Sequence, residues 1–468
     1  MLVYQHFLLP LLAWPFMAHD FARSFTKYNL DPVATRLLKK WLGVFRSADV
    51  VLLYRPRERF GMNLTSPSTW FKMMQTVKCI IIKNSQDSSI RVLYENRIEK
   101  DNFKDRQRHV WRATQLVSEV ESNFNFDNLF RGQGDRAGLG AGKYNPNPSA
   151  VEHRKACVAE VKNLEAQKHW SHARDLGLQG MWTKWFDSTF PLDFTWKTLL
   201  YGPGKSIIKF LLNASINALP TPDLRRLCGY SDVATCPLCG HQQCTCSHVL
   251  AGCSTALIQG RYTWRHDSVL LTLEGWIARH LDSHNSKPLV DHVHPHISQS
   301  FVRPGKTRRT RRKSKPQHLL SKAKDWVLLV DYTHDKMVFP EFIYVTKQRP
   351  DIVIYSRETC QVMLIELTCP AEEGILPAQL RKKARYTPLK ESIEARKIWT
   401  VELMTVEAGA RGFVASSMNS CLRKFGFSAN LASKVCKEVS LIVAKCSHTI
   451  WTLHQQKMWR KRCIVPRR

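Results

Sequence analysis

A cluster of cysteine and histidine residues between positions 236 and 253 constrains the possible structures of this chain more than any other feature of the sequence. The segment reads CPLCGHQQCTCSHVLAGC, with the spacing C-x2-C-x8-H-x4-C. This spacing lets four thiolate and imidazole ligands close a tetrahedron around Zn2+. We therefore predict a zinc site whose ligands are Cys236, Cys239, His248 and Cys253.

Three further potential ligands, His241, Cys244 and Cys246, lie in the same segment and compete with the predicted four. The alternative is a reduced, cysteine-rich turn without metal. A closed four-ligand site leaves no position for a reactive water, so the predicted zinc stabilises a small module and does not catalyse. The other cysteines are irregularly spaced and no secretory signal is evident, which favours a reducing compartment.

Basic residues far outnumber acidic ones, with 70 Lys and Arg against 39 Asp and Glu and a formal net charge of +31. Polyanions are the usual partners of such a chain, so we predict binding to DNA, with RNA as a second partner and no membrane. The run 303–315 holds eight basic residues in thirteen positions. It fits a phosphate-binding arm, a nuclear localisation signal or a solvated loop. The predicted nucleic-acid contacts are Arg308, Arg309, Arg311, Arg312, Lys313, Lys315 and Arg349.

A second constellation occupies the segment RPDIVIYSRETCQVMLIELTCP, which contains two strand-like runs separated by a polar turn. Asp351 opens the first run and Glu366 closes the second. If the runs pair as a hairpin, the two carboxylates face one another at one end of the sheet and can share a divalent cation. Mg2+ held in this way can activate water for phosphodiester cleavage. We predict a Mg2+-dependent nuclease site at this place.

The pattern PD-x14-E-x-T departs from the PD-(D/E)xK nuclease signature, because Thr368 stands where a lysine is usual. The lysine must therefore come from elsewhere, and Lys382 and Lys383 lie on the predicted helix that follows. The plainer interpretation makes Asp351 a turn residue before a strand and Glu366 a surface acid at a strand end. The basic composition and the cysteine cluster favour the nuclease.

The remaining segments predict an α+β fold. The first half shows helical spacing, as in VATRLLKKWLGVF, where Leu37, Leu38, Trp41 and Leu42 are expected on one buried face and Gly43 ends the helix. The aromatic residues between 150 and 230 fit a helical core better than a base-stacking surface. After residue 260, a long helix, several strands and further helices predict a mixed sheet flanked by helices.

Several motifs, in order along the chain, resemble the carboxyl-terminal half of the polyprotein of site-specific non-LTR retrotransposons with a restriction-like endonuclease. They include RLLKKWLG, LPTPDLRRL, CPLC with SHVLAGC, GRYTWRHDSVL, RPDIVI, LIELTCPAEE, KKARY and EAGARGF. The resemblance covers most of the chain and is densest from about 219 to 420. It implies a thumb-like segment 1–60, a helical linker 61–225 with a flexible loop near 131–150, a CCHC zinc knuckle 226–260 and an endonuclease domain 261–468.

The resemblance also implies a function, namely nicking of one strand of target DNA in the nucleus so that the new 3′ end primes copying of the element's RNA. It makes Asp351 and Glu366 the metal-binding acids and Lys382 the catalytic lysine, with Lys383 as the second choice. No adjacent pair of aspartates occurs in the sequence, so we do not expect reverse transcriptase activity from this chain alone. The alternatives are a catalytically inactive nucleic-acid-binding remnant, or the tail of a longer enzyme that needs its other half.

Overall fold

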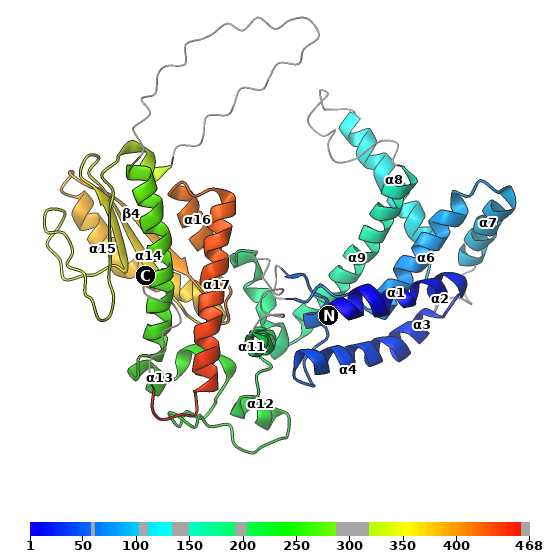
Figure 1. The fold of residues 1–468 in the computed structure, drawn as a ribbon, viewed down its shortest axis with the longest axis horizontal. Coiled ribbons are helices and arrows are strands. Elements are labelled where there is room, and N and C mark those ends of the chain that lie inside the picture. Colours follow the sequence, from blue (N-terminus) through cyan, green and yellow to red (C-terminus); the bar gives the residue numbers. More distant parts are fainter. Residues whose placement is uncertain (58–60, 103–110, 133–148, 192–203, 287–317, 460–468) are drawn as a thin grey trace, which may run out of the picture. The chain divides into compact units, whose positions relative to one another are not determined.

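The computed structural model describes residues 1–57, 61–102, 111–132, 149–191, 204–286 and 318–459. The chain divides into two compact units, Met1–Gly180 (unit 1) and Met181–Arg468 (unit 2), each with its own core (Figure 1). The basic run 303–315 and most of the loop predicted near 131–150 lie outside the described residues. Neither prediction is therefore tested.

Unit 1 is built from helices in the part of it that the structure describes. They are η1 (Tyr4–Leu8), α1 (Leu9–Leu11), α2 (Ala13–Ala18), α3 (Arg23–Phe25), η2 (Thr26–Leu30), α4 (Asp31–Leu42), α5 (Val51–Tyr54), α6 (Pro67–Lys83), α7 (Ser88–Asn102), α8 (Ala113–Gly132) and α9 (Ala150–Asp175). The 3-10 helix η4 (Leu178–Lys184) spans the division between the units.

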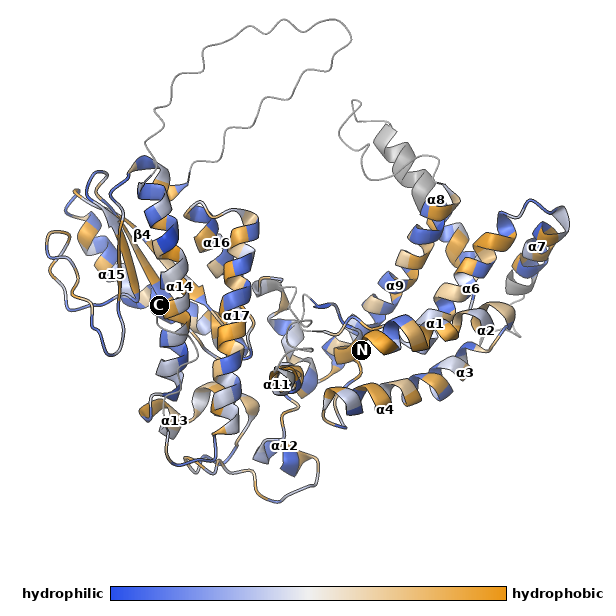
Figure 2. Cartoon of the chain, viewed as in Figure 1, coloured by the Kyte–Doolittle hydropathy of each residue, from blue (hydrophilic) through white to orange (hydrophobic). Residues whose placement is uncertain are grey.

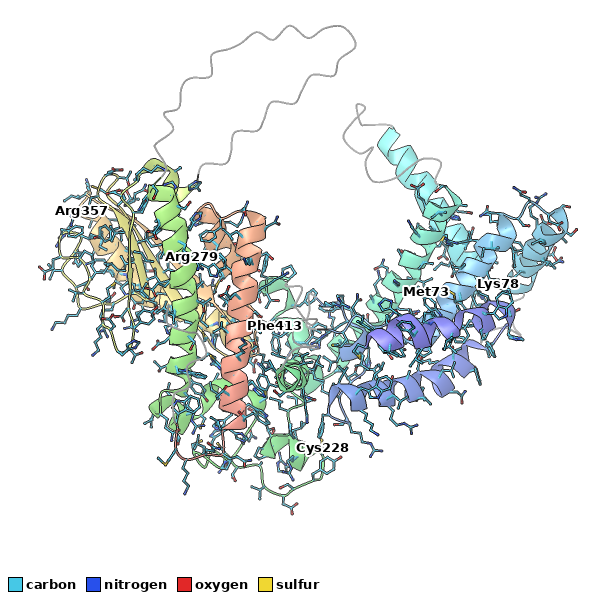
Figure 3. The ribbon with its side chains drawn as sticks, viewed as in Figure 1. Met73, Lys78, Cys228, Arg279, Arg357 and Phe413 are labelled. Carbon is cyan, nitrogen blue, oxygen red and sulfur yellow. The ribbon has the colours of Figure 1, made fainter. Side chains whose placement is uncertain are left out.

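Helix α6 is the centre of unit 1 and packs against α2, α7, α8 and α9. Its start is fixed by Ser66, whose hydroxyl accepts a hydrogen bond from the backbone of Thr69, and by Pro67 in the first turn. Met73 faces the core, whereas Lys78 forms an ion pair with Asp20 at 3.1 Å (Figure 3). The helix thus presents one apolar face and one polar face, as helical spacing predicts.

Helix α4 corrects the face that we predicted. Leu38 and Leu42 are buried, but Leu37 and Trp41 are 39% and 53% exposed. Residues spaced by four share a stripe, so Leu38 and Leu42 lie on one stripe. Leu37 and Trp41 lie on another, about 100° away around the helix, which faces outward. The predicted stop is confirmed, since Gly43 caps the helix in the left-handed conformation with φ 63°.

Unit 2 combines helices with one four-stranded sheet. Its helices are η5 (Phe186–Ser188), α11 (Lys205–Ser215), α12 (Pro222–Leu227), η6 (His248–Gly252), α13 (Ser254–Ile258), α14 (Arg261–Asn285), η7 (Leu319–Lys322), η8 (Glu372–Gly374), α15 (Ile375–Glu394), α16 (Ser416–Lys424) and α17 (Ala429–Thr452). Its strands are β1 (Val327–Val330), β2 (Ile352–Ser356), β3 (Gln361–Thr368) and β4 (Thr400–Glu407).

The sheet has the order β1-β2-β3-β4, with β1, β2 and β3 antiparallel and β4 parallel to β3. The hairpin of β2 and β3 follows the predicted pairing, with Ile352 opposite Ile365. Asp325 accepts hydrogen bonds from the backbone of Arg357 and Glu358 and so fixes the turn (Figure 3 labels Arg357). The mixed sheet of an α+β fold is confirmed at this level.

Both faces of the sheet are covered by helices. Ile352, Ile354 and Ile365 belong to a core that also includes residues of α14 and α17, which pack against each other. The alternate residues Val353 and Leu364 belong to a second core with α15 on the opposite face. Figure 1 shows α14 and α17 side by side, and Figure 2 shows the strands as a mostly hydrophobic layer. This burial on two sides holds the strand ends in fixed positions.

Candidate functional site

The four predicted zinc ligands come together in unit 2. The ligand atoms of Cys236, Cys239, His248 and Cys253 all lie within 4.8 Å of one another, and the structure shows such a group only here among the residues that it describes. The Cys239 Sγ lies 3.3 Å from His248 Nε2. A tight turn closed by Gly240, with φ 75°, brings the first two cysteines together. The group could hold a metal ion, and its ligand types are compatible with Zn2+.

The surplus ligands have other surroundings. The ring of His241 stacks on His248 with centroids 4.7 Å apart. The Cys246 thiol is buried beside the guanidinium of Arg411, and Cys244 is also fully buried. The four ligands chosen from spacing are therefore the four that the structure groups.

The two predicted acids also come together, at the end of the β2–β3 hairpin. The backbone amide of Asp351 donates to Glu366 Oε1 at 3.2 Å, and the amide of Leu367 donates to Asp351 Oδ2 at 2.7 Å. The Glu366 side chain has no exposed surface, while that of Asp351 is 14% exposed. The acid pair therefore sits at the boundary between the core and a surface opening.

Lys382 completes this group. Its Nζ lies 2.5 Å from Glu366 Oε2 and 3.7 Å from Asp351 Oδ2. One turn later on α15, the hydroxyl of Tyr386 donates to the backbone carbonyl of Arg349 at 2.9 Å, which fastens the helix beside the strand ends. The predicted lysine is therefore in contact with both predicted acids. We refer to Asp351, Glu366 and Lys382 as the acid site.

Lys383, the second choice for the lysine, is not part of the acid site. Its side chain is exposed, and its charge acts on Glu407, a buried carboxyl at the end of β4. The two lysines diverge because successive helical residues point about 100° apart. The structure thus brings Lys382 and not Lys383 to the acids.

His266, on α14, lies beside the acid site and was not predicted from the sequence. Its Nε2 lies 3.5 Å from Asp351 Oδ2, and its Nδ1 lies 3.3 Å from a carboxylate oxygen of Asp267. Burial alone lowers the pKa of His266, but the hydrogen bonds to Asp267 and Asp351 outweigh burial and raise the pKa to about 9. His266 is therefore an imidazolium at neutral pH and holds a positive charge against Asp351.

The two acids differ in their affinity for protons. Burial, followed by repulsion from Asp351, raises the pKa of Glu366 to about 7, although Lys382 opposes the shift. Burial also acts to raise the pKa of Asp351, but hydrogen bonding and the charge of His266, together with Lys382, lower it. Paired carboxyls with separated pKa values are common where proton or metal chemistry occurs.

Arg411, from the motif EAGARGF, links the cysteine cluster to the segment that follows β3. It is completely buried and donates to Glu372 at 2.7 Å, to Glu373 at 2.8 Å and to Ser247 at 3.2 Å. Glu372 follows β3 closely in the chain, and Ser247 directly precedes the ligand His248. The resulting network ties the end of β3 to the cysteine cluster. Its other acceptors are Asn217 Oδ1 and the carbonyl of Ala214.

A groove of about 530 Å3 runs between the cysteine cluster and the acid site. His248 and Gly252 line it on one side, and His266 and Lys382 line it on the other. Thr368, which replaces the usual lysine of the signature, also lines it, and its buried hydroxyl has no hydrogen-bond partner among the described residues. Of the acid site, Lys382 lines the groove, whereas Asp351 and Glu366 do not.

Of the seven predicted nucleic-acid contacts, only Arg349 belongs to the part of the chain that the structure describes. Its side chain is 39% exposed near the strand ends and lies 3.6 Å from Asp331. The other six, all in the run 303–315, lie outside the described residues: Arg308, Arg309, Arg311, Arg312, Lys313 and Lys315.

Comparison of the chain with models of known protein families and with curated proteins gives no match. None of the helices in the described ranges is both long enough and apolar enough to cross a membrane. The function is therefore inferred from the geometry of unit 2.

Proposed function

We propose that unit 2 is a metal-dependent endonuclease that nicks one strand of DNA. The observation that carries this proposal is the contact of Lys382 with both acids at the end of the β2–β3 hairpin. A surface ion pair without function does not need a fully enclosed glutamate, a second carboxylate and a partly buried imidazolium at one point. The hard carboxylate oxygens of Asp351 and Glu366 are of the type that Mg2+ prefers, which supports Mg2+ as the cofactor.

Each residue at the acid site has a separate role in the proposed cleavage reaction. Asp351 and Glu366 would hold Mg2+, which would lower the pKa of a water molecule and offset the charge of the phosphate. Lys382 must release Glu366 Oε2 before the cation can bind, because the glutamate is otherwise enclosed. The released ammonium then supplies positive charge beside the scissile phosphate. His266 keeps Asp351 ionised and oriented.

The bond changes are those of hydrolysis. The oxygen of a water molecule forms a bond to phosphorus, and the bond from phosphorus to the oxygen of the leaving strand breaks. The leaving oxygen takes a proton from solvent, and the proton of the attacking water passes to solvent. The reaction forms no covalent enzyme intermediate, because water itself attacks the phosphorus.

The wider proposal follows the resemblance. In it, the cysteine cluster is a zinc knuckle, unit 2 carries a PD-(D/E)xK-like endonuclease, and the chain derives from the carboxyl-terminal part of a non-LTR retrotransposon polyprotein. It acts in the nucleus on target DNA and also contacts element RNA. The chain as a whole is basic, whereas the acid site contains two carboxylates. This contrast supports a division in which the basic residues bind nucleic acid and the acid site cuts it.

The proposal is tested by nicking of supercoiled plasmid with the full chain, zinc and Mg2+. Asp351→Ala and Glu366→Ala should each abolish nicking and leave the affinity for DNA, measured in parallel, within about threefold, because the basic surface carries binding. Equal loss of binding and nicking would count against a catalytic role. Steep, salt-dependent binding without any nicking by the unaltered chain would select the inactive remnant instead.

A further inference from the structure

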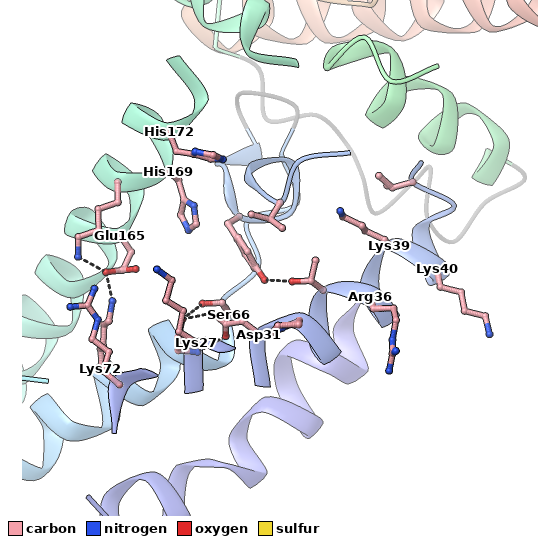
Figure 4. Close-up of a pocket in the computed structure, with 18 of the residues that line it drawn as sticks. Lys27, Asp31, Arg36, Lys39, Lys40, Ser66, Lys72, Glu165, His169 and His172 are labelled. Atoms are coloured by element: carbon pink, nitrogen blue, oxygen red, sulfur yellow. Dashed lines mark hydrogen bonds and ion pairs between the residues drawn. The ribbon is translucent and has the colours of Figure 1, made fainter. Parts of the chain in front are cut away.

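Unit 1 contains a cavity of about 960 Å3 that is lined by basic residues. None of the residues of the acid site belongs to this unit. The wall of the cavity is formed by η2, α4 and α9, together with residues at the starts of α3 and α6 and around α5 (Figure 4). The wall is therefore assembled from segments far apart in the sequence, and we call it the basic cavity.

The charges of the basic cavity are strongly unbalanced. Only two acids line it, Asp31 and Glu165. Eight cationic side chains line it: Arg23, Lys27, Arg36, Lys39, Lys40, Arg46, Lys72 and Lys168. The difference is eight minus two, or six positive charges with the histidines neutral. A concave wall of one charge sign concentrates ions of the opposite sign.

The two acids are already engaged within the wall. Glu165 pairs with Lys72 at 2.5 Å and with Lys168 at 2.8 Å. Asp31 accepts hydrogen bonds from the amide of Ser68 at 2.8 Å and from its hydroxyl at 2.5 Å. Neither carboxylate is left to neutralise the other cations of the wall.

Several cations of the cavity have no acidic partner among the residues that the structure describes. In the described part of the structure, Arg23, Arg36, Lys40 and Arg46 form no ion pair. Burial lowers the pKa of Lys72, and the charges of Lys168 and Arg23 act in the same direction, against Glu165. Such crowding of like charges costs free energy until an anion enters.

Flat rings lie among the cations. The rings of Tyr54 and His169 have centroids 5.2 Å apart, and both residues line the cavity. Figure 4 shows Lys27 and His169 projecting into the central space, whereas Arg36 and Lys40 point outward along the rim. A cationic concavity with aromatic faces suits a flexible chain of phosphates and bases better than the smooth outer surface of a duplex.

We propose that the basic cavity binds the phosphodiester backbone of a single-stranded nucleic acid. The cations contact phosphates, and the rings of Tyr54 and His169 offer a stacking surface for a base. The site is separate from the acid site in residues and in unit. Binding there is therefore independent of whether unit 2 cuts DNA.

The test measures binding of a fluorescent oligonucleotide of about 12 nucleotides, within the usual range of single-strand sites, to the full chain in EDTA-free buffer without Mg2+. Oligouridine and oligothymidine are used in separate arms to distinguish RNA from DNA. The cavity variant carries Arg23→Gln, Lys27→Gln and Arg46→Gln, whose side chains form no ion pair among the described residues. The control variant removes the same charge from exposed positions of α9 outside the cavity: Arg154→Gln, Lys155→Gln and Lys162→Gln.

The cavity variant should bind at least about tenfold more weakly than the control variant. The slope of log affinity against log salt should fall by about 2, because each phosphate that the variant no longer neutralises lowers the slope by about 0.7. The oligonucleotide that binds more tightly, oligouridine or oligothymidine, indicates whether the natural ligand is RNA or DNA. Equal weakening in both variants would overturn the proposal, because the effect would then be one of net charge. The proposal would also be overturned if the cavity variant lost as much affinity for a duplex as for the two single strands.

Discussion

The cysteine cluster and the acid site lie in the same unit but are assembled in different ways. All four ligands of the cluster come from one short segment, residues 236–253. The acid site takes Asp351 and Glu366 from two strands and Lys382 from α15, and it is flanked by His266 from α14. A local site can be predicted from spacing, whereas a site built from distant segments exists only when the whole sheet has formed.

Both sites combine buried and partly exposed side chains. In the cysteine cluster Cys236 and Cys253 are almost completely buried, whereas Cys239 and His248 are half-buried. In the acid site Glu366 is fully buried, whereas Asp351 and Lys382 remain 14% and 21% exposed.

Removal of a ligand from the cysteine cluster should have the largest effect. Cys236→Ser should abolish bound zinc and unfold the surrounding module, because structural zinc contributes roughly 10–16 kcal/mol of apparent binding free energy to such modules. Zinc content by mass spectrometry and the melting temperature measure the effect. Cys228→Ser, at an exposed cysteine outside the cluster, is the control and should change neither. Full zinc content in Cys236→Ser would refute the assigned ligands.

Substitution of Arg411 tests how much the buried network beside the cysteine cluster stabilises unit 2. Arg411→Ala leaves Glu372 buried without its partner and should lower the free energy of unfolding by about 3–5 kcal/mol. Lys424→Ala breaks the exposed pair with Glu402 and should cost at most about 1 kcal/mol. Chemical denaturation of both variants gives the comparison. A decrease below about 1 kcal/mol for Arg411→Ala would show that the buried network contributes no more to stability than an exposed ion pair.

Lys382 and Lys383, which are neighbours on α15, serve as a test residue and its control. Lys382→Ala should slow nicking by about 100- to 1000-fold, the usual effect of removing one charge-stabilising group, while Lys383→Ala should stay within about threefold. The rates are measured under single-turnover conditions at saturating Mg2+. Binding of Mg2+ should not weaken in Lys382→Ala, because the variant removes the ammonium that occupies Glu366. Equal slowing in the two variants would refute the role of Lys382.

The pH dependence follows from the raised pKa of Glu366. An acid with a pKa of about 7 is protonated below that pH and cannot bind a cation, so nicking at limiting Mg2+ should rise through about pH 7 and fall about tenfold per unit below it. Higher Mg2+ should move the midpoint to lower pH, because metal and proton compete. A flat profile down to about pH 5 would show that Glu366 is ionised throughout and that its burial has no consequence for metal binding.

Much of unit 2 could be predicted from the sequence because its signals are local. Two short apolar, strand-like runs predicted β2 and β3, and the polar turn between them predicted the pairing that places Asp351 beside Glu366. Lys382 came from the resemblance and not from spacing, because a side chain on a following helix reaches the strands only through the packing of α15.

His266 and the basic cavity could not be found in the same way. His266 lies on α14, and nothing in its immediate sequence shows that the helix crosses the end of β3. The face of α4 was predicted wrongly, since Leu37 and Trp41 were assigned to the core with Leu38 and Leu42. The cavity depends on how α4 and α9 pack, and a single helical pattern does not contain that information.

The most direct test of water attack at the acid site is hydrolysis in water enriched in heavy oxygen. The full, zinc-loaded chain is incubated with supercoiled plasmid and Mg2+, and the phosphate at the nick is analysed by mass spectrometry. We expect one heavy oxygen in that phosphate for the unaltered chain and no nicked product for Glu366→Gln. Nicking that persists in Glu366→Gln, or a product phosphate without heavy oxygen, would contradict water attack at the acid site.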